Sequence, residues 1–69
     1  MYQQMYVNMT DDQLLEQHEH AVNAKYFFID SARNAIQKHN LPYAQHCRLQ
    51  AQGWRNRLHA IERLLEPTP

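Results

Sequence analysis

The sequence predicts an all-α fold: an antiparallel two-helix hairpin that we expect to dimerise into a four-helix bundle. Apolar residues in the second half of the chain recur in alternating steps of three and four residues. This spacing keeps them on one side of a helix that packs along another helix. Turn and strand signals are scarce, with one Gly and three Pro among 69 residues. The apolar seam of that second helix comprises Ala44, Cys47, Ala51, Trp54, Leu58, Ile61 and Leu65.

Residues 1–9 form an N-terminal arm that carries no charged side chain. Tyr2, Met5, Tyr6 and Met9 recur at helical spacing, which fits a short amphipathic turn of helix. A flexible arm fits equally well, because chain termini are often poorly ordered. An arm that becomes ordered only against a partner is compatible with both alternatives.

The hairpin itself is predicted over residues 10–66, with its first helix over about 11–39. Thr10 and Gln13 form a capping box, in which the Thr hydroxyl accepts from the Gln13 N–H and the Gln13 side chain reaches back. Met9 and Leu14 occupy the positions of a hydrophobic staple around this cap. These signals place the start of the helix at Asp11.

The first helix carries two adjacent apolar rows, which together are wider than one neighbouring helix can cover. We assign one row to the contact with the second helix and the other to the dimer interface. The row assigned to the second helix comprises Leu15, His18, Val22, Lys25, Ile29, Ala32 and Ile36. The row assigned to the dimer interface comprises Leu14, Ala21, Phe28 and Ala35.

The turn is predicted at residues 40–41, followed by the second helix over about 42–66 and a short tail over 67–69. Asn40 can adopt the left-handed conformation that ends a helix, and Pro42 suits the first turn of the next helix. A connection this short makes the two helices antiparallel neighbours. In this pairing Gly53 lies opposite Phe28, and room for that ring would explain a glycine inside a helix.

Length and composition narrow the class of protein. A chain of 69 residues makes one domain with a small core, which a second copy would enlarge. No apolar run approaches the ~20 residues of a membrane-spanning helix, and we expect no membrane association. The beginning of the chain lacks the charged and apolar regions of a secretory signal. Cys47 is the only cysteine, which favours a reducing compartment, so we expect a cytoplasmic protein.

Residues with catalytic or metal-binding chemistry do not combine into a recognisable site. His18 and His20 are about 200° apart around a helix and cannot chelate one ion together. Cys47 follows His46, but neighbouring helical residues point about 100° apart, so the pair does not form a nucleophile and its base. We therefore expect no enzyme activity, no cofactor and no metal.

Nucleic acid is the alternative partner. Arg48, Arg55 and Arg57 could contact phosphates from a basic face of the second helix. The formal net charge is zero and the pI is about 7.0, however, whereas nucleic-acid-binding domains usually have a pI above about 9. The charge balance favours a protein partner.

Aromatic and apolar residues exceed what one pair of helices can cover, and these residue types are enriched at protein interfaces. We expect Tyr6, Phe27 and Tyr43 to lie outside the seam and to bind a partner protein. The predicted function is that of a small non-enzymatic interaction module that binds and modulates, for instance inhibits, another protein. Phages and mobile elements often make small proteins for that purpose. The comparison concerns the small size and the lack of catalytic residues, and no sequence motif supports it.

Overall fold

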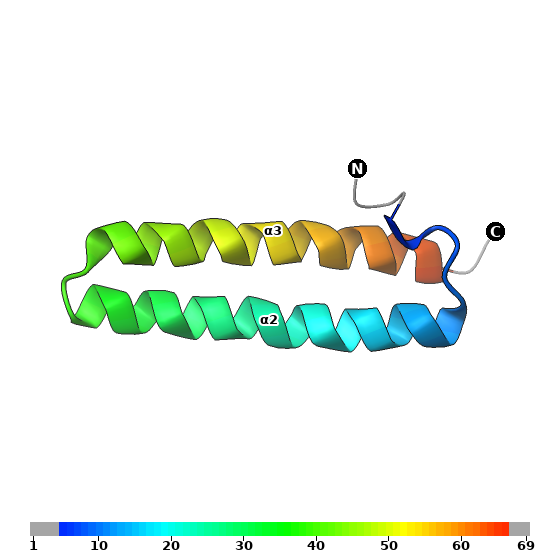
Figure 1. Ribbon diagram of the computed structural model, residues 1–69, viewed down its shortest axis with the longest axis horizontal. Helices are drawn as coiled ribbons and strands as arrows, with labels where there is room; N and C mark the ends of the chain where they lie inside the picture. The colour runs from blue at the N-terminus through cyan, green and yellow to red at the C-terminus, as the bar shows by residue number, and fades with distance from the viewer. Residues whose placement is uncertain (1–4, 67–69) are drawn as a thin grey trace.

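A computed structural model of the chain describes residues 5–66 and consists of two long antiparallel helices in that range (Figure 1). Helix α2 spans Asp11–Gln37 and helix α3 spans Leu41–Leu65, with no strand among the described residues. The helices lie side by side along their length in a rod of 47 × 19 × 19 Å. The all-α helical hairpin is confirmed. Residues 1–4 of the predicted arm and the predicted tail, 67–69, lie outside the described residues.

Helix α2 begins with the predicted capping box. The backbone N–H of Thr10 donates to Oε1 of Gln13 at 3.0 Å, and the N–H of Gln13 donates to Oγ1 of Thr10 at 3.2 Å. Asp11 and Asp12 add negative charge at the positive end of the helix dipole. An N-cap of this kind stabilises a helix by about 1 kcal/mol, so the first turn is fixed locally.

The turn lies earlier than predicted, because α2 ends at Gln37 rather than at about residue 39 and α3 begins at Leu41 rather than at about residue 42. His39, not Asn40, adopts the left-handed conformation, with φ of 58°. The N–H groups of His39 and Asn40 donate to the carbonyls of Ile36 and Ala35, the two bonds of a Schellman motif. Asn40 instead caps α3, since its Oδ1 accepts from the Tyr43 N–H at 3.3 Å. An N-cap residue is not left-handed, which is why the left-handed position passes to His39.

The core of α2 is centred on the row that the sequence assigned to a dimer interface, and Ala32 is the one buried residue of the row assigned to α3. Leu15 and Ile36, assigned to the contact with α3, are 56% and 48% exposed. Leu14, Ala21 and Ala35, assigned to a dimer interface, are instead buried inside the hairpin. The fourth member of that row, Phe28, is half-buried.

The physical reason for this position of the core is the size of the side chains. Three of the four buried residues of α2 are alanines, and α3 buries the small residues Ala44 and Cys47, so the two helices can approach closely. The buried set of α2 is Leu14, Ala21, Ala32 and Ala35. The buried set of α3 is Ala44, Cys47, Leu58 and Ile61, all on the predicted seam.

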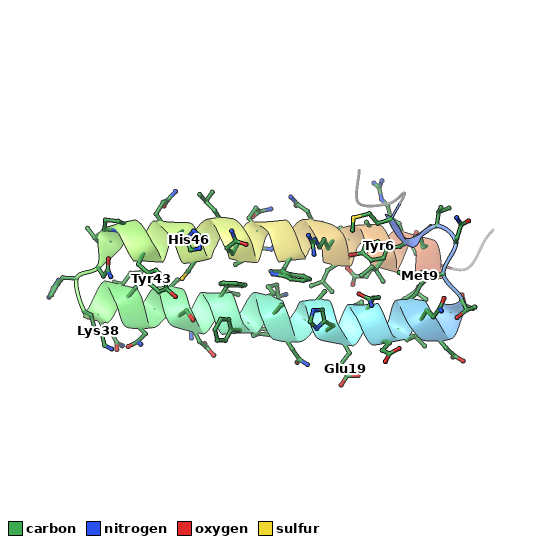
Figure 2. All side chains as sticks on the ribbon, in the orientation of Figure 1. Tyr6, Met9, Glu19, Lys38, Tyr43 and His46 are labelled. Atoms are coloured by element: carbon green, nitrogen blue, oxygen red, sulfur yellow. The ribbon has the colours of Figure 1, made fainter. Side chains whose placement is uncertain are left out.

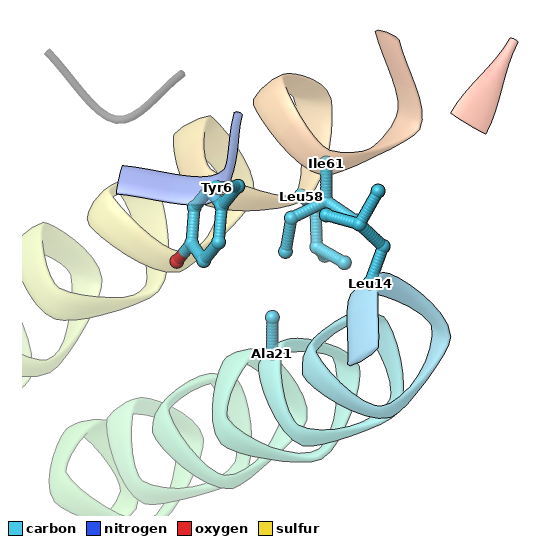
Figure 3. Packing of buried hydrophobic residues seen from close by; sticks show 5 residues of the cluster. All are labelled: Tyr6, Leu14, Ala21, Leu58 and Ile61. Carbon is cyan, nitrogen blue, oxygen red and sulfur yellow. The ribbon is translucent and has the colours of Figure 1, made fainter. Parts of the chain in front are cut away.

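The arm closes the open end of the hairpin. Tyr6, only 4% exposed, packs against Leu14, Ala21, Leu58 and Ile61 between the two helices (Figure 3). Residues 5–6 are helical and lead into a turn at 7–8, after which the Met9 N–H donates to the Tyr6 carbonyl at 3.1 Å. The prediction that Tyr6 is exposed is therefore wrong, because the wider apolar stripe at this end takes the ring into the core.

Candidate interaction surfaces

One long side of the hairpin carries a cluster of rings that we call the aromatic face. The imidazole of His20 meets the indole of Trp54 edge-on, with ring centroids 5.4 Å apart, and thereby links α2 to α3. The Arg57 guanidinium lies 4.5 Å from the centroid of Trp54. Phe27, two turns beyond His20, meets Phe28 edge-on at 5.2 Å. The aromatic face comprises His20, Phe27, Phe28, Tyr43, His46 and Trp54.

The rings of the aromatic face differ in how far they are buried. Phe27 is 63% exposed and Tyr43 is 49% exposed, as expected for residues outside the seam. Tyr43 stacks on His46 near the turn, whereas Tyr6 lies at the opposite end of the same hairpin (Figure 2). Trp54, which the sequence placed in the seam, is half-buried and packs on the edge of the core cluster. The face thus combines anchored rings with freely accessible ones.

Gly53 lies beside Trp54 on this face and has no packing role within the chain. A Cβ atom at Gly53 would meet nothing within 4 Å. The prediction that Gly53 makes room for Phe28 is therefore wrong. Gly53, Trp54, Gln50 and Arg57 instead line a shallow hollow at the surface of α3. The backbone at Gly53, next to Trp54, therefore carries no side chain and is not packed against other side chains.

The opposite side of the helix–helix contact carries what we call the basic groove. Two adjoining hollows of about 270 and 300 Å³ follow the boundary between α2 and α3. Four cationic and no acidic side chains line them, around an apolar floor. The basic groove comprises Lys25, Ile29, Ala32, Arg33, Ile36, Arg48, Ala51, Gln52 and Arg55.

The three arginines of the alternative nucleic-acid site do not share one surface. Arg48 and Arg55 line the basic groove, whereas Arg57 lies over Trp54 on the aromatic face. Residues 55 and 57 are two positions apart, and such residues point about 200° apart around a helix. The predicted basic face of the second helix is therefore divided between two sides of the molecule.

The Tyr43 hydroxyl has altered acidity because of its neighbour one turn further along α3. Hydrogen bonding with the Cys47 side chain is the largest cause that raises the pKa of Tyr43 above its ordinary value of 10.0. Negative charge on Cys47 acts in the same direction, as does desolvation. Tyr43 therefore remains a neutral hydrogen-bonding group at physiological pH.

Further properties of residues 5–66 concern metal sites, ion pairs and membrane-spanning helices. No three His, Cys, Asp or Glu side chains within this range are placed to hold a metal ion. His18 Nε2 approaches Glu62 Oε2 at 3.6 Å, an exposed pair that joins α2 to α3. Neither described helix is long and apolar enough to cross a membrane.

The described surface therefore offers two kinds of contact, aromatic on one side of the hairpin and basic with an apolar floor on the other. Both are shallow and run along the rod. Comparisons of the chain with protein-family models, with curated proteins and with solved structures find no match.

Proposed function

We propose that the chain is a non-enzymatic interaction module that binds and modulates another protein through its aromatic face. The observation that carries the proposal is the exposure of Phe27 and Tyr43 on a rigid helical scaffold, in line with anchored Trp54. Trp, Tyr and Arg dominate the binding energy of protein interfaces, and this face presents all three. Rings already fixed by neighbours lose little conformational freedom on binding.

Gly53 supports the same surface. A glycine inside a helix costs about 1 kcal/mol relative to alanine, and no contact within the chain offsets that cost. Close approach of a partner to the bare backbone beside Trp54 would offset it. The partner's contact region would then be centred near Trp54, with Phe27 and Tyr43 towards the turn.

The proposal includes self-association of two hairpins into a four-helix bundle, in which each copy keeps its aromatic face free. It assigns no cofactor, and it places the protein in the cytoplasm because Cys47 is a buried free thiol.

Nucleic acid remains the second candidate partner. The four cations that gather in the basic groove favour it, and its binding would weaken steeply as salt is added.

The test is affinity capture from cells of the natural source with matched single variants. Phe27→Ala and Tyr43→Ala should each lose the captured protein, and Leu49→Ala should retain it. Leu49 is the control because it is 62% exposed and lies on neither face. Truncation of an interface anchor typically weakens binding by 2 kcal/mol or more, roughly thirtyfold, which capture detects.

Two results would count against the proposal. Equal capture by all three variants would remove the aromatic face from the interaction. Recovery of nucleic acid in place of protein, lost at moderate salt and lost in Arg48→Ala and Arg55→Ala variants, would favour the second candidate.

A further inference from the structure

The charges of the hairpin are separated along its length. In the turn half, residues 25–55, five basic side chains oppose one acidic side chain: Lys25, Arg33, Lys38, Arg48 and Arg55 against Asp30. In the open half, the described residues outside that range, six acidic side chains oppose two basic ones. They are Asp11, Asp12, Glu16, Glu19, Glu62 and Glu66 against Arg57 and Arg63. A rod with net charges of +4 and −4 in its two halves follows from these counts.

The side of the hairpin that holds the basic groove repeats this separation on α3. The residues of α3 on this side recur in steps of four and three, so they form one helix face. Its part near the turn is basic and its part near the open end is acidic. In chain order they are Arg48, Gln52, Arg55, His59 and Glu62, and Glu66 follows as the C-cap residue directly after α3.

The same side of α2 carries an uncovered apolar row at seven-residue spacing. Leu15 and Ile36 at its ends are 56% and 48% exposed, and Val22 and Ile29 between them are half-buried. Rows at this spacing stay in register with a neighbouring helix, so this row can form half of a bundle core.

We propose that a second copy of this chain covers the basic groove, antiparallel to the first, with the turn half of each copy against the open half of the other. This inference rests on the self-association included in the proposed function, and it assigns the surface and the orientation. Two-fold symmetry about an axis across the rod stacks α2 on α2 and α3 on α3. Arg48 of each copy then lies towards the acidic end, Glu62 and Glu66, of the other, and Arg55 lies near the symmetry axis.

Charge and area both favour this occupant. The opposite orientation would bring the two basic turn halves together, and like-charge contacts across an interface are unfavourable. A face of 47 by 19 Å offers on the order of 900 Å² per copy, and a stable interface needs about 800 Å² per partner. The apolar row contributes the hydrophobic contact, and the charges select the orientation.

The test uses two double variants of opposite charge. Arg48→Glu with Arg55→Glu makes the α3 face acidic, and Glu62→Lys with Glu66→Lys makes it basic. Each variant alone should dimerise at least about tenfold more weakly than the unaltered chain, measured by sedimentation equilibrium at low salt. An equimolar mixture should recover dimers, because all facing charges are then complementary.

Leu49→Glu is the control, since it adds a charge to an exposed residue of α3 outside the basic groove and should leave dimerisation nearly unchanged. Ile36→Lys tests the apolar row independently and should also yield monomers. Circular dichroism should show that each variant keeps its helices. A monomeric unaltered chain, dimers in either double variant alone, or a mixture that stays monomeric would each overturn the inference. Partner capture retained in aromatic-face variants that still dimerise would count against the proposed function and leave this inference standing.

Discussion

Leu14 and Leu15 are neighbours in the sequence, yet Leu14 is 3% exposed in the hairpin core and Leu15 is 56% exposed on the surface. The backbone turn of about 100° between them separates the core from the uncovered apolar row. Their identical side chains make them a matched pair, in which only position differs.

Leu14→Ala should therefore destabilise the hairpin by about 2–4 kcal/mol, because it leaves a cavity beside Tyr6 and Ile61. Leu15→Ala should change the stability of the monomer by under about 1 kcal/mol. Urea unfolding at low protein concentration measures both. Equal losses would show that the core of α2 is not centred on Leu14.

His39→Gly should stabilise the protein by about 1 kcal/mol. His39 has φ of 58°, a conformation that costs L-residues roughly 1–2 kcal/mol and glycine little, although the greater freedom of an unfolded glycine offsets part of the gain. Thermal unfolding followed by circular dichroism measures the change. Gln37→Gly, inside the last turn of α2, is the control and should destabilise by about 1 kcal/mol. A loss of stability in both variants would contradict the assigned turn.

Gly53→Ala should stabilise the hairpin by about 0.5–1 kcal/mol, since the new methyl group meets open space and alanine is the better helix former. The same variant should weaken binding of the partner, because the methyl group occupies the bare backbone beside Trp54. Unfolding and capture must both be measured. Ala60→Gly, also on α3, should show the opposite change in stability. Unimpaired capture by Gly53→Ala would remove the functional explanation for this glycine.

The pKa of Tyr43 should fall towards its ordinary value in Cys47→Ala, because the largest cause of its elevation is removed. Ultraviolet absorbance of the phenolate, compared with Tyr43→Phe, follows this titration. Folding that raises the pKa holds the phenolic proton more tightly, so its contribution to stability is present below pH 10.0. The contribution is lost as the pH rises from 10.0 through the raised pKa. An unchanged titration in Cys47→Ala would contradict the interaction.

Local signals in the sequence determined where helix α2 begins and which side of helix α3 is buried. The Thr10–Gln13 capping box acts within four residues, so it fixes the start of α2 without any tertiary contact. The spacing from Ala44 to Ile61 predicts the buried side of α3, because that helix has a single apolar stripe. The exposure of Phe27 and Tyr43 followed from the same periodicity.

Only the tertiary structure decided which of two adjacent stripes on α2 faces α3. Both stripes have helical periodicity, and the choice depends on how closely Ala21, Ala32 and Ala35 let the helices approach. That choice buried Tyr6, which fills the wider end of the contact, and left Leu15 and Ile36 exposed beside the basic groove. Periodicity gives the angle between side chains around one helix, whereas packing between helices sets the rotation of that helix about its axis.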